Sequence, residues 1–331
     1  MHAPDFWYPK GRRTPLAARL LAPLGWAYAA IARLKMKRAK PVRVSIPVIC
    51  VGNLTAGGSG KTPVVIEILK RLKARGLKPF ALARGYGGAE RGPVRVDAER
   101  HSASQVGDEP LLLAACAPAV IAHGRAAGAQ LAIEQGADLI VMDDGFQNPS
   151  LAKDFSFVVV DGEMLFGNNH VIPAGPLREP VSEGLARADA VIMIGGANAQ
   201  LDARGKPLLR AALAPVPPFE GLKNRKLFAF AGIGRPQKFF ATLAALGLDV
   251  AGTQAFPDHH AYAKSEIARL KAKAAGIGAS LITTEKDFVR LGHEDRTGIS
   301  TLPVHAKFED SAALDRLLDQ ALASRRRSAT P

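Results

Sequence analysis

The sequence is short of cysteine, and this shortage limits the class of protein that it can form. Only Cys50 and Cys116 occur among its 331 residues, so a disulfide framework is excluded and the chain fits a reducing compartment. Cys50 lies inside an apolar run, which favours a buried thiol over a nucleophile. Apolar residues make up 47% of the chain, which excludes a disordered protein, and the length suggests about two domains.

The N-terminal region lacks an apolar run long enough to cross a bilayer. No residue is charged from Leu20 to Ala32, but these thirteen residues fall short of the roughly 20 that a spanning helix needs. Arg12-Arg13 before this stretch superficially resembles an export signal. Pro23 and Gly25 interrupt the stretch, and the basic cluster that follows it favours retention on the cytoplasmic side of a membrane.

Acidic residues are also missing from a long N-terminal segment. Between Asp5 and Glu67 every charged residue is basic, and together with three arginines near the C-terminus these residues account for the net charge of +14. A local basic excess indicates an anionic partner, either a membrane leaflet or a nucleic acid. We expect no nucleic acid, because aromatic residues are not interleaved through the basic segment. The basic residues are Lys10, Arg12, Arg13, Arg19, Arg33, Lys35, Lys37, Arg38, Lys40, Arg43 and Lys61, and then Arg325, Arg326 and Arg327.

Residues 1–40 form the first predicted region, a basic amphipathic segment with Trp26 and Tyr28 suited to a membrane interface. Thr14-Pro15 is a typical helix start, while Pro23 is expected to kink or restart the helix. At about 100° per residue the basic and the large apolar side chains fall on opposite sides. The helix therefore lies on an anionic leaflet or docks on its own domain, and both can hold in part. The apolar side carries Leu16, Leu20, Leu24, Ala27, Ile31 and Leu34, and the basic side Arg12, Arg19, Arg33 and Lys37.

The most informative motif is a glycine-rich turn between a predicted strand and a predicted helix. It runs from Gly52 to Thr62, after the apolar run Val44 to Val51. In such a turn backbone N–H groups and the helix N-terminus surround nucleotide phosphates, the lysine reaches the β- and γ-phosphates, and the threonine ligates Mg²⁺. Thr55 stands where the usual pattern has glycine, and a turn without a ligand is the alternative. The expected nucleotide-binding residues are Thr55, Ala56, Gly57, Gly58, Ser59, Gly60, Lys61 and Thr62.

The order of the predicted elements indicates an α/β fold. Continuously apolar strands alternate with helical segments, as in a P-loop NTPase-like, doubly wound parallel sheet. The proline-rich residues 214–218 are predicted to be a linker, so we place a P-loop kinase domain at residues 41–220 and a smaller α/β domain, closing over the site, at residues 221–331. The predicted strands are Ser45–Val51, Pro79–Ala83, Ala119–Ala122, Leu139–Met142, Phe155–Val160 and Ala190–Ile194 in the first domain, and Lys226–Ala231 and Ser280–Thr284 in the second, with a helix at Pro236–Ala245.

Several aspartates lie after predicted strands or in loops. In a doubly wound sheet, ligands bind beyond the carboxyl ends of the strands. Asp143 and Asp144 close an apolar strand, which is the usual place of the Mg²⁺ partner of a P-loop, and Gln147 follows on the same loop. The alternative for Asp144 is helix capping. Asp108 precedes an apolar helix and is either its N-cap or a catalytic base.

Arginines and histidines complete the candidate site. Three arginines are expected at the active-site edge of the sheet, where they neutralise phosphoryl charge or hold an anionic substrate; the alternative for any one of them is a surface salt bridge. His259 and His260 lie on a loop of the second domain, and a carboxylate–imidazole pair across the domains would deprotonate an acceptor hydroxyl only on closure. A zinc site is not expected, because no Cys/His cluster is present. The three arginines are Arg84, Arg125 and Arg178.

Together these motifs closely resemble one family, the tetraacyldisaccharide 4′-kinases of lipid A biosynthesis. The matching motifs run in order over nearly the whole chain, and the family's loop has the same form around Thr55. They are Gly52-Asn53-Leu54-Thr55-Ala56-Gly57-Gly58-Ser59-Gly60-Lys61-Thr62-Pro63, Arg84-Gly85-Tyr86-Gly87, Val106-Gly107-Asp108-Glu109-Pro110, Asp143-Asp144-Gly145-Phe146-Gln147, Pro173-Ala174-Gly175-Pro176-Leu177-Arg178-Glu179, Asp258-His259 and Thr284-Glu285-Lys286-Asp287.

The resemblance implies an ATP- and Mg²⁺-dependent kinase on the cytoplasmic face of the bacterial inner membrane, with no obligate protein partner. Its substrate would be a lipid A disaccharide precursor, a tetraacylated glucosamine disaccharide 1-phosphate, whose 4′-hydroxyl it would phosphorylate to give lipid IVA. The rival interpretation is a membrane-associated P-loop NTPase regulator without small-molecule kinase activity. By position, the resemblance assigns nucleotide and Mg²⁺ to Lys61 and Thr62, the metal site to Asp143 and Asp144, and the base to Asp108 with support from His259. Lys61 and Arg178 are also expected to take part in catalysis. Further site positions are expected at Arg84, Glu109, Arg125, Gln147 and Glu179.

Overall fold

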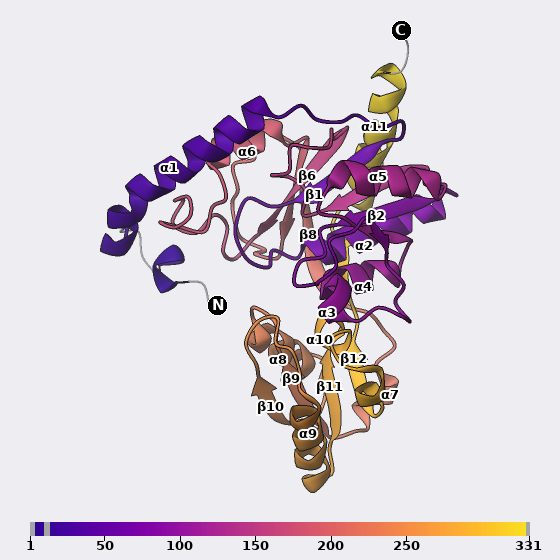
Figure 1. The fold of residues 1–331 in the computed structure, drawn as a ribbon. Helices are drawn as coiled ribbons and strands as arrows, with labels where there is room; N and C mark the ends of the chain where they lie inside the picture. Colours follow the sequence, from indigo (N-terminus) through magenta and orange to yellow (C-terminus); the bar gives the residue numbers. More distant parts are fainter. Residues whose placement is uncertain (1–3, 10–13, 329–331) are drawn as a thin grey trace.

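A computed structural model gives the fold of residues 4–9 and 14–328, with side chains up to residue 324, and two sheets organise it (Figure 1). Within these residues the larger sheet has nine strands in the order β13-β8-β7-β6-β1-β5-β2-β4-β3, and the smaller has four in the order β10-β9-β11-β12. The strands of the larger sheet are β1 (Val48–Gly52), β2 (Pro79–Ala83), β3 (Val94–Arg95), β4 (Ala119–Ile121), β5 (Leu139–Asp143), β6 (Phe155–Asp161), β7 (Ala190–Ile194), β8 (Leu208–Pro215) and β13 (Val304–Phe308), and those of the smaller are β9 (Leu227–Ala231), β10 (Val250–Ala255), β11 (Ser280–Thr284) and β12 (Ile299–Leu302).

Strand β1 lies in the middle of the larger sheet, and this position places the glycine-rich turn. It pairs in parallel with β5 on one side and with β6 on the other. Ile49 and Val51 face one apolar core, and Val48 and Cys50 face a second core across the sheet. Every residue of β1 is buried, which accounts for its unbroken apolar sequence and confirms the predicted doubly wound α/β fold.

Helices cover both faces of the larger sheet (Figure 1). One core receives side chains from α2, α4 and α11, and the opposite core receives them from α5 and α6. The two parts of the chain are called the larger unit, built on the nine-stranded sheet, and the smaller unit, built on the four-stranded sheet. The helices of the larger unit are α1 (Leu16–Arg38), α2 (Lys61–Ala74), α3 (Ala103–Val106), α4 (Asp108–Ala114), α5 (Arg125–Glu134), α6 (Val181–Arg187) and α11 (Ser311–Ser328), and those of the smaller are α7 (Glu220–Lys223), α8 (Pro236–Ala245), α9 (Lys264–Gly276) and α10 (Glu285–Phe288), with 3₁₀ turns at Asp5–Trp7 and His293–Arg296.

The C-terminal part of the chain returns to the larger unit, which corrects the predicted boundary at the end of the smaller domain. Strand β13 pairs antiparallel with β8, and α11 packs on α2 through buried leucines. Arg71 of α2 and Arg75, the residue after α2, both pair with Asp315 of α11, at 2.9 and 2.7 Å. Strand β8 also takes in the first part of the predicted linker, up to Pro215. The smaller unit therefore ends near Leu302, because β13 completes the edge of the larger sheet.

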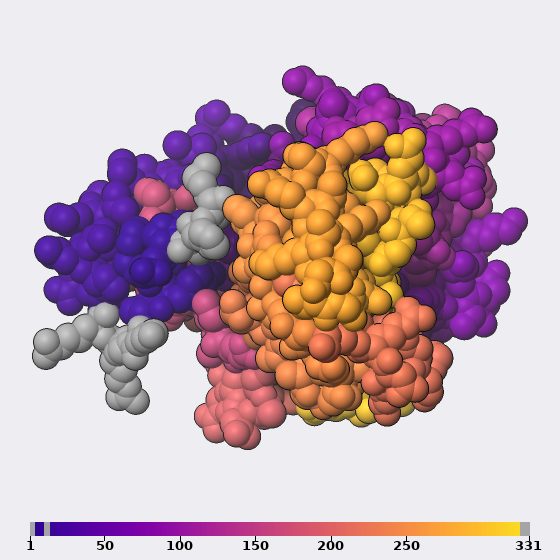
Figure 2. Space-filling model, turned by 90° about the horizontal axis from the view of Figure 1, so that it is seen from below, coloured from indigo at the N-terminus to yellow at the C-terminus, as the bar shows by residue number. Residues whose placement is uncertain are grey.

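Helix α1 docks through its small side chains and exposes its large ones. Ala18, Ala22, Gly25 and Ala29 are buried, and a Cβ on Gly25 would lie 2.8 Å from the carbonyl oxygen of Val171. Seen from the side of the smaller unit, α1 protrudes from one flank of the molecule (Figure 2). Lys10, Arg12 and Arg13 and the side chains of Arg325, Arg326 and Arg327 lie outside the described residues. The exposed apolar side chains of α1 are Leu16, Leu20, Leu24, Trp26, Tyr28, Ile31 and Leu34.

Helix α1 is unbroken at Pro23 and too short in its apolar part to span a bilayer. The helix continues through Pro23 and does not restart there, because Pro23 is exposed and the Arg19 carbonyl that loses its donor can be hydrated. Among the described residues no helix is both long and apolar enough to span a bilayer. The docking alternative is therefore confirmed for the small side chains of α1, and the exposed apolar face leaves contact with a leaflet as a prediction.

Leu318→Ala should destabilise the larger unit, because this side chain of α11 is fully buried in the core shared with α2. The lost transfer free energy and the cavity together reduce the free energy of unfolding by about 2–5 kcal/mol. Asp319→Ala is the control, since Asp319 is exposed and its pair with Arg75 contributes at most about 1 kcal/mol. Urea denaturation measures both variants, and equal midpoints would contradict the placement of α11 in this core.

Candidate active site

The glycine-rich turn between β1 and α2 keeps its backbone open. Gly57 and Gly60 have φ angles of 109° and 79°, which L side chains rarely adopt. A Cβ built on Gly57 or Gly58 meets no heavy atom within 4 Å, so side chains do not fill the space beside the turn. Hydrogen bonds fix the entry of the turn, from Asn53 Nδ2 to the Thr55 carbonyl at 2.8 Å and from Ala56 N to Pro176 O at 2.7 Å. This arrangement leaves room and N–H groups for phosphate.

Lys61, Asp144 and Arg178 meet at the mouth of the turn. Lys61 is the first residue of α2, and its Nζ lies 3.5 Å from Oδ1 of Asp144, the residue after β5. Arg178 donates through Nη1 to both carboxylate oxygens of Asp144, at 3.0 and 3.2 Å. Burial would raise the pKa of Asp144, but Lys61 and Arg178 lower it below its ordinary value. Asp144 is therefore an ionised carboxylate held between two cations rather than a helix cap.

Asp143, at the end of β5, has a different environment from its neighbour. It is buried, and neither of its carboxylate oxygens accepts a hydrogen bond from any described residue. Burial, followed by the charge of Glu109, raises the pKa of Asp143 to about 8. A buried carboxylate without a partner is costly unless a cation neutralises it.

Hydroxyl groups of the glycine-rich turn and of α2 offer oxygen atoms of the kind that a hard cation prefers. The hydroxyl of Ser59 is also buried without a hydrogen-bond partner among the described residues, and Thr62 stands in the first turn of α2. Carboxylate and hydroxyl oxygens are the ligands that Mg²⁺ prefers, and its remaining positions are commonly filled by water and phosphate oxygens. The unpartnered oxygens of Asp143 are thus consistent with a Mg²⁺–nucleotide site.

Gln147 and Glu179 link the loop of Arg178 to the glycine-rich turn. Gln147 Nε2 donates to the Asn53 carbonyl at 2.8 Å and to Glu179 Oε1 at 3.0 Å. Glu179 is buried and receives both terminal nitrogens of Arg187, at 2.7 and 2.9 Å. These contacts tie the loop that carries Arg178 to the start of the glycine-rich turn. The polar atoms of Gln147 and Glu179 are therefore engaged in holding the site together.

Asp108 and His259 come from different units and lie in hydrogen-bonding distance. Asp108 is the first residue of α4, whose N-cap is Gly107, and His259 lies in the loop after β10. His259 Nδ1 is 3.1 Å from Asp108 Oδ2. His260 instead pairs with Glu266 at 3.0 Å, inside the smaller unit. The structure thus pairs Asp108 with His259 and not with His260.

Two cations that the sequence analysis did not assign to the site also face Asp108. Arg290 donates through Nε to Asp108 Oδ2 at 2.8 Å, and its Nη2 contacts the same oxygen. Lys286 Nζ lies 4.0 Å from that oxygen and 3.0 Å from Oε1 of Glu109. Burial would raise the pKa of Asp108, but His259, Lys286 and Arg290 lower it well below its usual range. Both cations follow β11, so the rule that ligands meet at carboxyl ends of strands could have indicated them.

The other two predicted arginines flank the site without an ion pair among the described residues, so the surface salt bridge expected as their alternative is not seen there. Arg84 directly follows β2 and is exposed. Arg125 is the first residue of α5, is almost fully buried, and donates through Nη1 to the Ala122 carbonyl. Burial and the neighbouring Arg84 lower the pKa of Arg125. Arg84 is therefore the arginine of this pair with access to a ligand from solvent.

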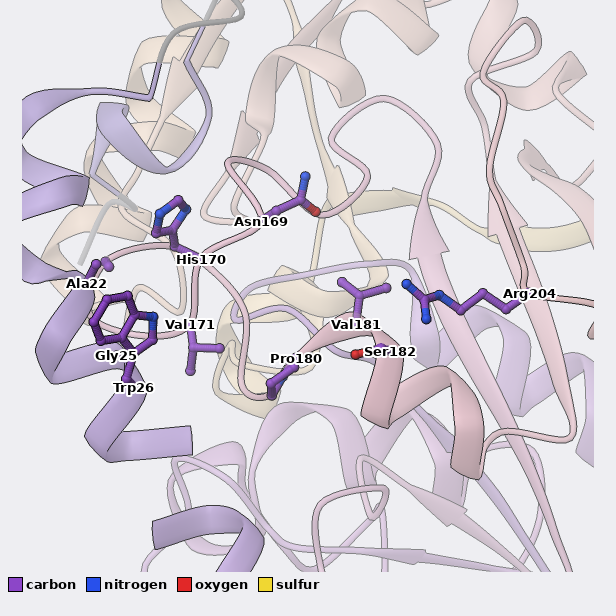
Figure 3. A pocket seen from close by; sticks show the side chains of 11 residues that line it. Ala22, Gly25, Trp26, Asn169, His170, Val171, Pro180, Val181, Ser182 and Arg204 are labelled. Carbon is purple, nitrogen blue, oxygen red and sulfur yellow. The ribbon is translucent and has the colours of Figure 1, made fainter. Parts of the chain in front are cut away.

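A separate pocket of about 350 Å³ lies between α1 and the rest of the larger unit (Figure 3). One wall comes from Ala22, Gly25 and Trp26 of α1, and the facing wall comes from residues 169–171, 174 and 180–182 and from Arg204. None of these lining residues belongs to the glycine-rich turn or to the Asp108–His259 pair. The pocket is therefore a feature of the docked helix rather than the nucleotide site.

The fold and these contacts define a P-loop nucleotide-binding protein of the doubly wound α/β class, in which a second unit contributes side chains to the site. A family model described as tetraacyldisaccharide-1-P 4′-kinase matches residues 17–323. The chain therefore belongs to this family, and the resemblance inferred from its motifs is confirmed.

Individual relatives agree with the family model. The chain is 52% identical over 330 residues to a protein of Rhodospirillum centenum named tetraacyldisaccharide 4′-kinase, with 98% of each chain covered. It is 50% identical over 344 residues to a protein of the same name from Parvibaculum lavamentivorans, with 99% of this chain and all of the relative covered. A crystal structure of LpxK from Aquifex aeolicus in complex with ATP matches with a TM-score of 0.76 at 27% identity, over 93% of this chain and 100% of that one. The overall fold is thus that of a protein solved with ATP.

Gly57→Ala should weaken ATP binding, because the φ angle of 109° at this position is unfavourable for a residue with a Cβ. A strain of about 1–2 kcal/mol corresponds to a fall in affinity of about five- to thirtyfold. Gly58→Ala is the matched control, since Gly58 has no left-handed φ angle and space for a Cβ. Calorimetric titration with ATP measures both variants. If the two bound ATP equally well, the conformation of the turn would not govern the affinity.

Proposed function

We propose that the chain transfers the γ-phosphoryl group of ATP, with Mg²⁺, to the 4′-hydroxyl of a tetraacylated glucosamine disaccharide 1-phosphate, giving lipid IVA. Its family and the names of its relatives support this reaction. The observation that carries the proposal is that a nucleotide half and an acid–base half adjoin. Glu109, next to Asp108 of the Asp108–His259 pair, lies close enough to Asp143 to raise its pKa. In this proposal the acceptor hydroxyl binds at the Asp108–His259 pair, and the γ-phosphate is bound in the adjoining nucleotide half.

In this proposal the glycine-rich turn, Thr55 to Thr62, holds the phosphates through backbone N–H groups. The 3.5 Å separation of Lys61 Nζ from Asp144 exceeds a normal hydrogen bond, so the ammonium group keeps donors for phosphate oxygens. Asp143, Asp144 and Thr62 would hold Mg²⁺, which neutralises charge on the phosphates when bound. Arg178, fixed on Asp144, adds a second cation where charge develops during transfer.

The Asp108–His259 pair is proposed to receive the proton of the acceptor hydroxyl. The low pKa of Asp108 makes this carboxylate a weak base in the ground state. Such a base suits phosphoryl transfer, whose loose transition state leaves most of the proton on the attacking oxygen until late. Orientation of the hydroxyl toward the phosphorus atom then contributes more than proton removal.

We further propose that the smaller unit closes over the site. His259, Lys286 and Arg290 reach Asp108 from the smaller unit. A second set of interunit ion pairs joins Arg235 to Asp161 and, at 3.0 Å, to Glu163, and this set makes no contact with the site. Separation of the units would break the Asp108–His259 pair, so the pair is complete only in the closed arrangement.

The exposed apolar face of α1 supports a location on the membrane surface. An acceptor with several acyl chains lies in a leaflet, and the enzyme must reach it there. Large apolar side chains on the outside of α1, with basic residues from Arg33 to Lys40, suit an anionic leaflet. We propose the cytoplasmic face of the bacterial inner membrane, where ATP is present, with no obligate protein partner.

The decisive experiment is incubation of the purified protein with radiolabelled ATP, Mg²⁺ and the lipid disaccharide 1-phosphate in detergent micelles. The wild type should label the lipid, and Lys61→Ala should lower the rate roughly a thousandfold, because the main phosphate cation is lost. Lys70→Ala, an exposed lysine on α2, is the control and should keep the wild-type rate. ATP hydrolysis without labelled lipid would favour the regulator interpretation instead, and stimulation by DNA or RNA would point to a nucleic-acid partner.

Replacement of two exposed side chains of α1, Leu20→Gln with Trp26→Gln, should weaken association with anionic vesicles. Both side chains are about 70% exposed, so their replacement spares the fold while removing apolar area that would enter the leaflet. A loss of at least about 2 kcal/mol lowers the partition coefficient about thirtyfold. Ala30→Gln, also exposed on α1, is the control. Sedimentation with phosphatidylglycerol vesicles measures all three proteins, and unchanged partitioning would leave α1 as a docked helix alone.

A further inference from the structure

Arg290 contacts the larger unit and the interior of the smaller unit through one buried guanidinium group. It follows α10 in the smaller unit, and its side chain is only 5% exposed. Its Nε donates to Asp108 Oδ2 in the larger unit at 2.8 Å, and Nη2 contacts the same oxygen. Its Nη1 donates to Asp287 Oδ1 at 2.9 Å and to the Gly232 carbonyl at 2.7 Å. Every nitrogen of this buried guanidinium group is thus engaged, two of them on a single carboxylate oxygen.

The partners of Arg290 inside the smaller unit also hold the loop that carries His259. The Gly232 carbonyl that receives Arg290 also accepts from His259 N at 3.1 Å. Asp287 Oδ1 accepts from Gly232 N and from the hydroxyl of Tyr262, both at 2.9 Å. His259 itself has a φ angle of 57°, which a residue with a side chain adopts only where its surroundings hold it. Arg290 is therefore bonded both to the carboxylate of Asp108 and to the Gly232 carbonyl, which also accepts a hydrogen bond from the backbone of His259.

We propose that Arg290 is a positioning residue that fixes the Asp108–His259 pair in the geometry required for phosphoryl transfer. The inference rests on the proposed kinase function and adds a residue to its acid–base half. Arg290 acts through Asp108 and His259 and does not itself touch the acceptor. It sets the rotamer of the Asp108 carboxylate, because two donors from one planar group approach the same oxygen. It also sets the distance between α4 and the His259 loop.

The planar fork of arginine is what this role requires. A guanidinium group directs Nε and Nη2 to one acceptor while Nη1 points to others, with a geometry fixed by its own plane. The ammonium group of a lysine is a single point donor on a flexible stem, and it cannot reach Asp108, Asp287 and Gly232 together. Lys286, one turn earlier, already supplies a point charge at 4.0 Å from Asp108. A second lysine at position 290 would therefore keep the charge and lose the orientation.

Removal of Arg290 should also change the protonation of Asp108. The charged and titratable groups that face Asp108 are His259, Lys286 and Arg290, with Glu109 paired to Lys286 and Asp287 paired to Arg290. Loss of one cation leaves Asp108 with less positive charge around it, so its pKa rises toward the ordinary value. The carboxylate then takes up a proton at higher pH than in the wild type. The acidic limb of the rate profile should accordingly move to higher pH.

The first test compares Arg290→Ala and Arg290→Lys with the wild type in the lipid-phosphorylation assay. Arg290→Ala should lower kcat about a hundredfold, because misplacement of the reacting groups by about 1 Å has an effect of this size. The KM for ATP should change less than about threefold, since the nucleotide half is untouched. Arg290→Lys should recover part of the rate but not all of it. A kcat within twofold of wild type for Arg290→Ala, or full recovery by lysine, would overturn the proposal.

A matched control separates positioning from simple loosening of the two units. Arg235→Ala removes the other interunit arginine, which pairs with Asp161 and Glu163 away from Asp108. This variant should keep the wild-type acidic limb, whereas Arg290→Ala shifts it. In an Asp108→Asn background, Arg290→Ala should add little further loss, because Arg290 acts through that carboxylate. Equal profiles for the two arginine variants, or fully additive losses with Asp108→Asn, would leave Arg290 as an interunit contact alone.

Nitrogen NMR of the histidine side chains tests the same proposal without catalysis. The Nδ1 signal of His259, assigned with His259→Gln, reports its hydrogen bond to Asp108. Arg290→Ala should move this signal toward that of an unbonded imidazole, while thermal unfolding shows that the protein remains folded. An unchanged His259 signal in folded Arg290→Ala would overturn the positioning role. Absence of lipid labelling by the wild type would instead overturn the proposed function, so the two failures are distinguishable.

Discussion

The contact between Asp108 and the smaller unit is the constraint on which the site depends. A single carboxylate oxygen of Asp108 faces His259 and Arg290, with Lys286 nearby, and all three cationic or imidazole groups come from the other unit. Because Asp108 and Arg290 are both about 5% exposed, separation of the units leaves buried charges without partners unless water enters. The contact that joins the two units at Asp108 is therefore also the contact that forms the Asp108–His259 pair.

The pKa values of two buried carboxylates in the site are shifted in opposite directions, because the two groups have different neighbours. Asp143 has no hydrogen-bond donor among the described residues, and burial with the charge of Glu109 raises its pKa to about 8. Asp108 is nearly as buried, but the cations of the smaller unit lower its pKa instead. A buried carboxylate without a hydrogen-bond donor can bind a metal cation. A carboxylate that is already paired with cationic side chains can instead hold an imidazole ring in place. Glu109 is bonded to Lys286 and its charge raises the pKa of Asp143, so the two environments influence each other electrostatically.

Local sequence patterns predicted the central strand of the fold. They did not predict the elements whose place depends on pairing with distant parts of the chain. The apolar run before Gly52 predicted β1, because a strand buried on both faces needs no alternation. The return of β13 and α11 to the larger sheet was missed, because the proline-rich linker suggested a domain boundary and no local signal shows which sheet an edge strand joins. In the site, the end of a predicted strand located Asp143 and Asp144 at the edge of the sheet. The same rule points only to the region after β11, and the contact across the units singles out Arg290, which lies beyond α10. Sequence reasoning therefore finds residues placed by one strand more easily than residues placed by the meeting of two units.

Helix α1 shows how one sequence pattern satisfies two surfaces. Its alanines and Gly25 allow the backbone to approach the loop at Val171 closely, so docking needs no large side chain. Most of its leucines, Trp26 and Ile31 are exposed, although a helix docked in the ordinary way buries such residues and exposes small or polar ones. An exposed apolar row of this length is unfavourable in water and favourable at a lipid surface, so its presence on a helix that is already anchored argues for a second, apolar environment. The loop that contacts Gly25 at Val171 continues along the chain to Arg178. A helix held at a leaflet would therefore also hold this loop, and with it the phosphate-binding edge of the sheet, at a fixed height above the lipid.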